Sequence, residues 1–330
     1  MKGTVALAHS VSVCCLGFCL GLNPASANAS TIYVSTFNGN TIESYDTNGN
    51  GSIFATGASG LDDPYGLAVD GQGDLFAANT GNHTIEEFSP SGQGSVFANL
   101  GAYEPFDLAF DSEGNLYATA ADMPYGLFSG YAILKLSSSG GMSVFTSTGN
   151  QFGFAGLAID GSGNLYTGNS YTTIEKFNAS GVGSTFANTG FYNPEGLTFD
   201  TSGNLYVSSY GNNQIYKFDP SGNGSFFAGS ITSLTNSGVS FPIGLAFDES
   251  GNLYVADHGT GTIESENLQG KGALFASTVA GNAVGLAIFD AEANIVAIPE
   301  PKTVALLGFG LTALAFVHLG SRRRSAARAR

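Results

Sequence analysis

The sequence repeats with a period of 40 to 49 residues, and this repeat limits the possible folds more than any single motif. A short apolar segment ending in aspartate recurs as "GLAVD", "DLAFD", "GLAID", "GLTFD", "GLAFD" and "GLAIFD". The aspartates are Asp70, Asp111, Asp160, Asp200, Asp248 and Asp290, at spacings of 41, 49, 40, 48 and 42 residues. Each unit is too short to bury a core alone, so the repeat predicts stacked, similar units.

Each unit contains four short apolar segments, which we name A, B, C and D in chain order. The unit that begins with "GLAID" continues with "NLYT", "TIEKF" (Thr173 to Phe177) and "GSTFA" (Gly183 to Ala187). Segments of this length and composition, bounded by Gly, Asn, Asp and Ser, are typical of strands. Leu205, Tyr206 and Val207 are consecutive apolar residues, which indicates a sheet covered on both faces. The sequence therefore predicts an all-β, six-bladed β-propeller of four-stranded antiparallel blades.

The two ends of the repeat region predict how the ring closes. The region opens with a B strand, "TIYVS" at Thr31 to Ser35, and its last A strand is Gly285 to Asp290. One blade is therefore expected to combine both ends, which protects the sheet edges. A further segment, "NIVAI" at Asn294 to Ile298, also resembles a B strand, and we assign it to the exit from the ring.

The clearest unit is "PEGLTFDTSGNLYVSSYGNNQIYKFDPSG", at Pro194 to Gly222. It resembles NHL-type propeller repeats and, more loosely, lactonase and streptogramin-lyase propellers, and its pattern extends over roughly residues 31 to 290. The resemblance is specific for the fold. It implies no single activity, because propellers carry many unrelated functions.

The chain ends differ from the repeats and predict three parts: residues 1–29, 30–298 and 299–330. Residues 1–29 combine Lys2, an apolar stretch and small residues around Ala27, the pattern of a signal peptide. All three cysteines lie in this segment, so the exported chain would contain none. The segment from Thr303 to Leu319 is apolar and just long enough for a short transmembrane helix, which the sequence therefore predicts. An arginine cluster follows it.

The order of a Pro-Glu-Pro motif, an apolar helix and basic residues resembles the PEP-CTERM sorting signal of Gram-negative bacteria. The matching residues are Pro299, Glu300, Pro301, Arg322, Arg323 and Arg324. The resemblance implies an exosortase as a partner, transient anchoring in the inner membrane, cleavage near the motif, and release to the cell surface or exopolysaccharide matrix. A permanent membrane anchor is the alternative interpretation.

The charge distribution argues against nucleic acid as a partner. All 26 acidic residues lie between Glu43 and Glu300, where only four lysines and no arginine accompany them. Such a surface repels a polyanion, because nucleic-acid affinity depends on basic side chains that neutralise phosphates. We therefore expect no nucleic-acid binding.

Strand order predicts that the B-C and D-A loops share one face of the propeller. The two long insertions, Ala121 to Tyr131 and Gly229 to Phe241, both fall on this loop face. Variable loops on a rigid scaffold commonly carry binding sites, and aromatic rings stack on sugars or anchor protein partners. The candidate binding residues are Tyr65, Phe106, Tyr125, Phe128, Tyr131, Tyr171, Tyr192 and Tyr210.

A catalytic site has weaker support in the sequence. A lactonase-type metal site would draw on Glu195, Asp257, Asn79 and Asn169, which are predicted at A-strand starts and B-strand ends. Apart from Glu195, the residues expected just before the A strands (Tyr65, Phe106, Ala155, Ile243 and Val284) are not ligands. His83 and His258 lie in B-C loops of separate units and are expected to be solvated rather than to form a lyase pair.

The sequence thus favours an exported module that binds a polysaccharide or an envelope protein without turnover and without a cofactor. The alternative is a lactonase or hydrolase that depends on a divalent metal, with Glu195 and Asp257 among the ligands. A passive, acidic matrix component is a third hypothesis. Neither the identity of the ligand nor the oligomeric state follows from the sequence.

Overall fold

The computed structural model describes residues 30–149, 153–169, 172–229 and 239–290. The predicted signal peptide, the segment at Asn294 to Ile298 and the predicted sorting signal, with its apolar helix, lie outside these residues. Within the described ranges, no helix is long and apolar enough to cross a membrane.

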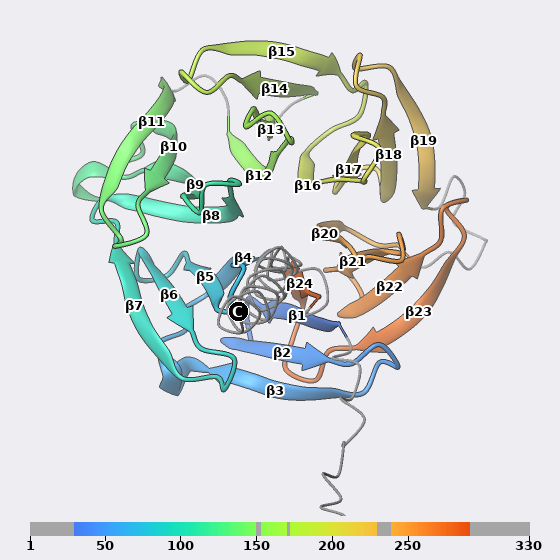
Figure 1. Cartoon of the computed structure of the whole chain (residues 1–330), viewed down its shortest axis with the longest axis horizontal. Coiled ribbons are helices and arrows are strands. Elements are labelled where there is room, and N and C mark those ends of the chain that lie inside the picture. The colour runs from blue at the N-terminus through green and yellow to red at the C-terminus, as the bar shows by residue number, and fades with distance from the viewer. Residues whose placement is uncertain (1–29, 150–152, 170–171, 230–238, 291–330) are drawn as a thin grey trace, which may run out of the picture.

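Six four-stranded sheets stand around a central axis (Figure 1). Within each sheet the strands follow the order A, B, C, D from the axis outward. The A strands are β4 (Pro64–Val69), β8 (Tyr103–Phe110), β12 (Phe154–Ile159), β16 (Pro194–Phe199), β20 (Pro242–Phe247) and β24 (Ala283–Phe289). The B strands are β1 (Thr31–Thr36), β5 (Leu75–Asn79), β9 (Leu116–Asp122), β13 (Leu165–Asn169), β17 (Leu205–Ser209) and β21 (Leu253–Asp257). The C strands are β2 (Thr41–Tyr45), β6 (Thr84–Phe88), β10 (Gly130–Leu136), β14 (Thr173–Phe177), β18 (Gln214–Phe218) and β22 (Thr262–Glu266). The D strands are β3 (Gly51–Thr56), β7 (Gly94–Asn99), β11 (Met142–Gly149), β15 (Gly183–Asn188), β19 (Gly224–Gly229) and β23 (Gly272–Ser277). The predicted six-bladed, four-stranded antiparallel propeller is confirmed.

Blades 1 to 5 are the sheets β4–β7, β8–β11, β12–β15, β16–β19 and β20–β23, and blade 6 closes the ring. In blade 6, β24 from the end of the repeat region pairs antiparallel with β1 from its start, with Ile32 opposite Ile288. The prediction that Thr31 to Ser35 completes the closing blade is confirmed. The B-C and D-A loops lie on one face of the disc, as the antiparallel strand order requires.

Large aromatic side chains fill the spaces between blades. Tyr166 on β13 contacts Phe186 of its own D strand and Phe199 of the next blade, with both ring centroids 5.1 Å away. Tyr206 repeats this arrangement with Phe227 and Phe247. Edge-to-face contacts of this kind add to the apolar area that stacking buries, so each blade is held by its two neighbours.

The repeated aspartates close the A-B turns. Asp200 Oδ1 accepts hydrogen bonds from the backbone N–H groups of Ser202 and Asn204, and its Oδ2 accepts one from the Asn204 amide. Asp111, Asp160 and Asp248 bind the matching asparagine of their own turns in the same way. These hydrogen bonds give the repeated aspartates a structural role in the turns.

Every A strand bulges toward the axis. The bulge lies at the second and third residues of each strand except β8, where it lies at Phe106 and Asp107. In blade 1, Pro64 pairs with Asn79 and Leu67 pairs with Ala77, so Tyr65 and Gly66 stand opposite Ala78 alone. The same register shift occurs in the other five blades. An extra residue re-aims a side chain. Tyr65, Glu195 and their equivalents therefore lie inside the A strands, not just before them as the sequence analysis expected.

Glycine after the bulged residue lets the A strands approach one another. A Cβ on Gly196 would lie 1.9 Å from the carbonyl oxygen of Ile243, and one on Gly285 would lie 2.0 Å from that of Tyr65. Five of the six A strands have glycine here: Gly66, Gly156, Gly196, Gly244 and Gly285. The sixth residue at this position is Asp107.

Candidate functional site

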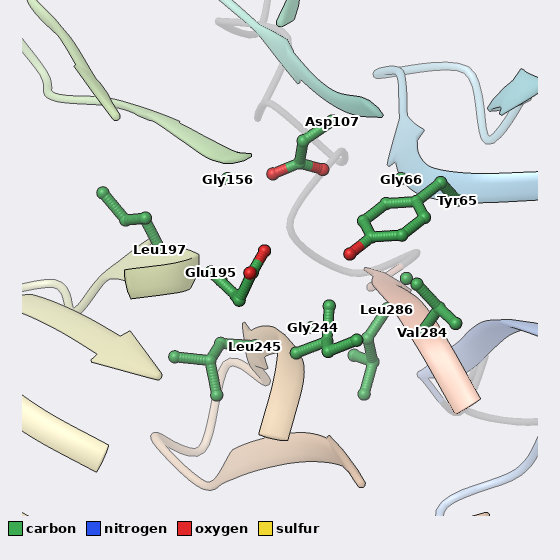
Figure 2. Close-up of a pocket in the computed structure, with 13 residues that line it drawn as sticks. Tyr65, Gly66, Asp107, Gly156, Glu195, Leu197, Gly244, Leu245, Val284 and Leu286 are labelled. Carbon is green, nitrogen blue, oxygen red and sulfur yellow. The ribbon is translucent and has the colours of Figure 1, made fainter. Parts of the chain in front are cut away.

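The bulged residues of all six A strands line the central channel. Figure 2 shows the carboxylates of Asp107 and Glu195 and the hydroxyl of Tyr65 pointing toward the same space. The cavity between them has a volume of about 30 Å³, room for a few water molecules at most. The channel therefore holds two acids and a phenol from blades 2, 4 and 1.

Burial makes both channel acids weak. Asp107 accepts hydrogen bonds from the backbone N–H groups of Leu157 (2.8 Å) and Leu108 (2.9 Å). Desolvation outweighs these bonds and raises the pKa of Asp107 to about 6. Desolvation, reinforced by the nearby charge of Asp107, raises the pKa of Glu195 to about 7. Burial, followed by the charges of Glu195 and Asp107, raises the pKa of Tyr65 well above its usual value.

The channel acids can therefore exchange a proton near neutral pH, the range in which a general acid or base operates. Tyr65 and Glu195 were predicted from the sequence as candidate site residues, whereas Asp107 was not. A signal was present, since "DLAFD" places an acid where the other five A segments have glycine. The period alone could not reveal that this position faces the axis.

The four residues of the metal hypothesis do not form a common site. Asn79 Oδ1 accepts the N–H of Asp62, and its amide donates to the Gly60 carbonyl and to Thr84 Oγ1. Asp257 Oδ2 accepts the N–H of Ser240, and its Oδ1 accepts those of Gly259 and Thr260. Asn169 Oδ1 accepts the N–H of Thr173.

The oxygens that a metal would need are thus occupied by backbone donors that shape the D-A and B-C loops. Of these four residues, only Glu195 lines the channel. No group of three or more His, Cys, Asp or Glu side chains suited to a metal occurs within the described ranges. These residues do not fit the proposed ligand set.

The two loop histidines are on blades 1 and 5 and make separate contacts. His83 Nδ1 is 3.0 Å from the Gly101 carbonyl oxygen. His258 lies 6.3 Å from the ring of Tyr210, and burial lowers its pKa. The structure does not bring them together.

The loop face carries a raised insertion on blade 2. Between β9 and β10, a 3-10 turn, η2 (Pro124–Gly126), presents Tyr125 with its side chain fully exposed. Tyr125 adopts a left-handed backbone conformation (φ 59°), which is uncommon for a bulky residue and marks candidate functional positions. Leu127 and Phe128 follow and are also exposed. We call Tyr125, Leu127 and Phe128 the blade 2 ridge.

A cavity of about 250 Å³ lies beside this ridge. Its lining combines Tyr103 and Tyr131 with Asp122, which accepts a 2.5 Å hydrogen bond from Ser129 Oγ. The Tyr131 ring also packs edge-on against Phe128, with centroids 4.9 Å apart. Ridge and cavity form one continuous candidate surface.

The remaining predicted binding residues are spread around the loop face. Tyr192 is exposed, whereas Tyr210 packs on Phe241 with ring centroids 4.8 Å apart. Tyr65 and Phe106 contact each other edge-on near the channel, at 6.1 Å. Tyr171 lies outside the described residues.

Comparison with known proteins places this architecture among other propellers. The propeller of a nidogen/laminin complex aligns with a TM-score of 0.67 and 18% identity, over 79% of this chain and 99% of that chain. A gluconolactonase from Xanthomonas campestris aligns at 0.57 and 19% identity, over 69% and 79% of the two chains. A streptogramin B lyase aligns at 0.52 and 18% identity, over 76% and 74%.

The chain is a six-bladed β-propeller. No protein-family model and no curated protein sequence matches it. The similar structures are a complex-forming protein, a lactonase and a lyase, so the likeness is one of fold.

Proposed function

We propose that the chain is a non-catalytic binding module that recognises a polysaccharide through its loop face. The observation that carries this proposal is the blade 2 ridge, where a fully exposed tyrosine is held in an unfavourable backbone conformation. Exposed apolar side chains that adjoin one another mark interaction surfaces. The neighbouring cavity supplies what a sugar ring requires, namely aromatic faces together with hydroxyl and carboxylate hydrogen-bonding groups.

Charge narrows the class of polysaccharide. Two acidic residues are near the cavity. Asp122 lines it, and Glu104 lies close enough to Tyr131 that its charge, in addition to burial, raises the pKa of Tyr131. An anionic chain would be repelled at this position. We therefore propose neutral polysaccharides as ligands of the loop face.

The test is affinity electrophoresis of the full-length chain through gels containing soluble β-1,3-glucan, β-1,4-glucan or alginate. We expect at least one neutral glucan to retard the protein, and the double variant Tyr125→Ser/Phe128→Ser to bind at least tenfold more weakly. The control is Val96→Ser, which removes an exposed apolar side chain from β7 outside the loop face. Equal retardation of the double variant and the unmodified chain would refute the proposal.

A protein partner is the main competing occupant of the same surface. The similar propeller of the nidogen/laminin complex is seen in a complex with a protein. A protein ligand is favoured if none of the three polysaccharides retards the chain and if one envelope protein is captured only when the blade 2 ridge is intact.

Hydrolysis remains the second candidate because the channel contains Glu195 and Asp107 with pKa values near neutrality. A similar propeller is a gluconolactonase. We derive no step through a metal, since Asn79, Asn169 and Asp257 are committed to backbone hydrogen bonds. Assay of lactone hydrolysis by the unmodified chain and by Glu195→Ala tests this candidate, and turnover that is lost in the variant would support it.

We also propose that the protein is exported and sorted as its terminal sequences indicate. Pro299, Glu300, Pro301 and the cluster Arg322 to Arg324 would direct an exosortase to the tail, followed by release to the cell surface or matrix. Mass spectrometry of protein from a producing Gram-negative host should show a chain lacking both ends. A Glu300→Ala variant that is processed identically would contradict this interpretation.

A further inference from the structure

Three blades hold a lysine ammonium group at the same place on the face opposite the loop face. In blades 2, 3 and 4, the lysine of the C strand lies over the tyrosine of the B strand, with Nζ 4.9 to 5.1 Å from the ring centroid. Each Nζ is also 3.4 to 3.9 Å from the aspartate of the A-B turn. The lysines are Lys135, Lys176 and Lys217. An ammonium group is stabilised both by the ring face and by the carboxylate.

Blade 1 has an aromatic ring and a turn aspartate at the same places but no lysine. Phe76 stands at the tyrosine position, and the residue paired with it across the sheet is Glu87 instead of lysine. Asp74 replaces the asparagine that binds the turn aspartate in blades 2, 3, 4 and 5. Three carboxylates, Asp70, Asp74 and Glu87, therefore occupy positions where the lysine-bearing blades have an aspartate, an asparagine and a lysine.

The turn aspartate of blade 1 lacks the partners that its equivalents have. Asp70 Oδ1 accepts the N–H groups of Gln72 and Asp74, as in the other turns. Within the described part of the chain, Asp70 Oδ2 receives no hydrogen bond, whereas Asp200 Oδ2 receives one from Asn204 and one from Lys217. The oxygen that faces the ammonium group in blade 4 is thus unpaired in blade 1.

Blades 5 and 6 show that loss of lysine alone does not create this arrangement. Their C strands carry Ser265 and Ser44 opposite Tyr254 and Tyr33. These substitutions are neutral, so among the six blades only blade 1 gains acidic groups at these positions.

A cavity of about 680 Å³ opens at this point between blades 1 and 2. Its lining includes the rings of Phe76, Phe97 and Phe110, whose centroids are 5.0 and 5.1 Å apart. The acidic lining residues come from both blades: Asp70, Glu87, Asp111 and Glu113. The volume lies in the range of small-molecule sites and exceeds what an ammonium group alone would fill.

We propose that this cavity binds the primary ammonium group of an amino sugar, in a polysaccharide whose amino groups are not acetylated. The ammonium group takes the place that lysine holds in blades 2, 3 and 4, over Phe76 and between Asp70 and Glu87. The sugar ring occupies the rest of the cavity against the aromatic rings, and the side chains of Gln72, Ser112 and Ser138 line it with hydrogen-bonding groups. This site is on the opposite face from the blade 2 ridge and does not depend on the function proposed there.

The electrostatics of the cavity favour such a ligand. Burial and the charge of Asp70 raise the pKa of Asp74, and burial with the charges of Asp74 and Asp70 raises that of Glu87. The smaller part of each shift comes from repulsion between the ionised carboxylates. A bound ammonium group would relieve that repulsion, because an opposite charge stabilises ionised carboxylates.

The test is calorimetric titration of the full-length chain with a glucosamine tetramer, and with the N-acetylglucosamine tetramer as a neutral probe. We expect saturable binding of the glucosamine tetramer, at least tenfold weaker binding of the acetylated one, and weakening by added salt. The key variant is Glu87→Lys, which fills the site with the chain's own ammonium group. It should bind the glucosamine tetramer at least tenfold more weakly while its thermal midpoint stays equal or rises.

Two further variants keep the result interpretable. Ser265→Lys places a lysine at the same position of blade 5, with half the change in net charge of Glu87→Lys, and should leave binding unchanged. Glu87→Gln removes one carboxylate without adding an amine and should also weaken binding of the glucosamine tetramer. It takes the place of Glu87→Lys in the test if that variant does not fold. The proposal is overturned if the glucosamine tetramer does not bind, if both tetramers bind equally, or if Glu87→Lys and Ser265→Lys weaken binding to the same extent, since that would reflect net charge alone. Loss of glucan binding in the ridge variant leaves this titration unaffected.

Discussion

Asp107 shows how one residue can change the chemistry of a symmetrical channel. Five A strands have glycine at its position, and added Cβ atoms there would lie 1.9 to 2.5 Å from atoms of the next A strand. At the sixth position the chain accommodates a side chain and turns its carboxylate onto the Leu157 amide of blade 3. Where the glycines allow neighbouring A strands to approach closely, Asp107 instead joins blades 2 and 3 by a hydrogen bond. It also places a second carboxylate in the channel with Glu195.

The glycine positions lead to a prediction about packing around the channel. Gly196→Ala places a Cβ 1.9 Å from the Ile243 carbonyl oxygen, so blades 4 and 5 must separate. We expect the free energy of unfolding to fall by about 2 kcal/mol or more, as for other overpacked positions. Urea denaturation measures the change. The control is Gly161→Ala, where a Cβ would meet nothing within 4 Å. Equal effects of both variants would show that close approach of the A strands does not limit stability.

At the scale of strands, the sequence predicted more of the fold than of the site. The A, B, C and D segments, the six blades and the closing strand Thr31 to Ser35 follow from periodic apolar runs, because burial on both faces leaves a strong pattern. The bulge at Tyr65 and Gly66 left no such pattern, since it depends on register with β5. Similarly, Asn79 and Asp257 have ligand-type side chains, yet loop geometry, which the sequence does not encode locally, commits them to backbone donors.

The C strand of blade 5 departs from its equivalents in one buried position. Tyr45, Phe88, Phe177 and Phe218 end their C strands with a ring over the first glycine of the D strand. Blade 5 has Glu266 there, almost completely buried, with Oε2 unpaired within the described ranges. Burial, followed by the charge of Glu264, raises the pKa of Glu266 to about 7.

This position predicts a dependence of stability on pH. Because the folded-state pKa of Glu266 exceeds its unfolded value, the folded state binds the proton more tightly, and stability falls as pH rises from about 4.5 to 7. The penalty above pH 7 is at most about 3.5 kcal/mol, at roughly 1.4 kcal/mol per pKa unit. Glu266→Phe restores the ring and should raise the thermal midpoint at pH 8 more than at pH 5.

Glu266→Gln serves as the companion variant, since it removes the charge without adding a ring. Both variants should flatten the pH profile of thermal unfolding between pH 5 and pH 8. A residual slope is expected from Asp107 and Glu195, whose folded-state pKa values are also raised. A profile as steep as that of the unmodified chain in both variants would rule out Glu266 as its source.

For the molecule as a whole, stability depends on a ring that is closed by noncovalent contacts. β24 pairs with β1 in blade 6, and Ser35 of β1 donates a 2.5 Å hydrogen bond to the Tyr65 carbonyl oxygen of blade 1. The Gly285 N–H donates to the same Ser35 hydroxyl. One short strand therefore joins the two ends of the repeat region and links blade 6 to blade 1.

Removal of β1 should accordingly affect the entire propeller. A chain that lacks residues 1–36 leaves β24 and β2 with unpaired edges, which exposes backbone groups to other chains. We expect loss of a single cooperative unfolding transition, and concentration-dependent aggregation, by calorimetry and light scattering. The matched control lacks residues 1–29 alone, keeps β1, and should unfold as one cooperative unit. If the two truncated chains melt alike, another segment must complete blade 6, and Asn294 to Ile298, with its B-strand pattern, would be the one to delete next.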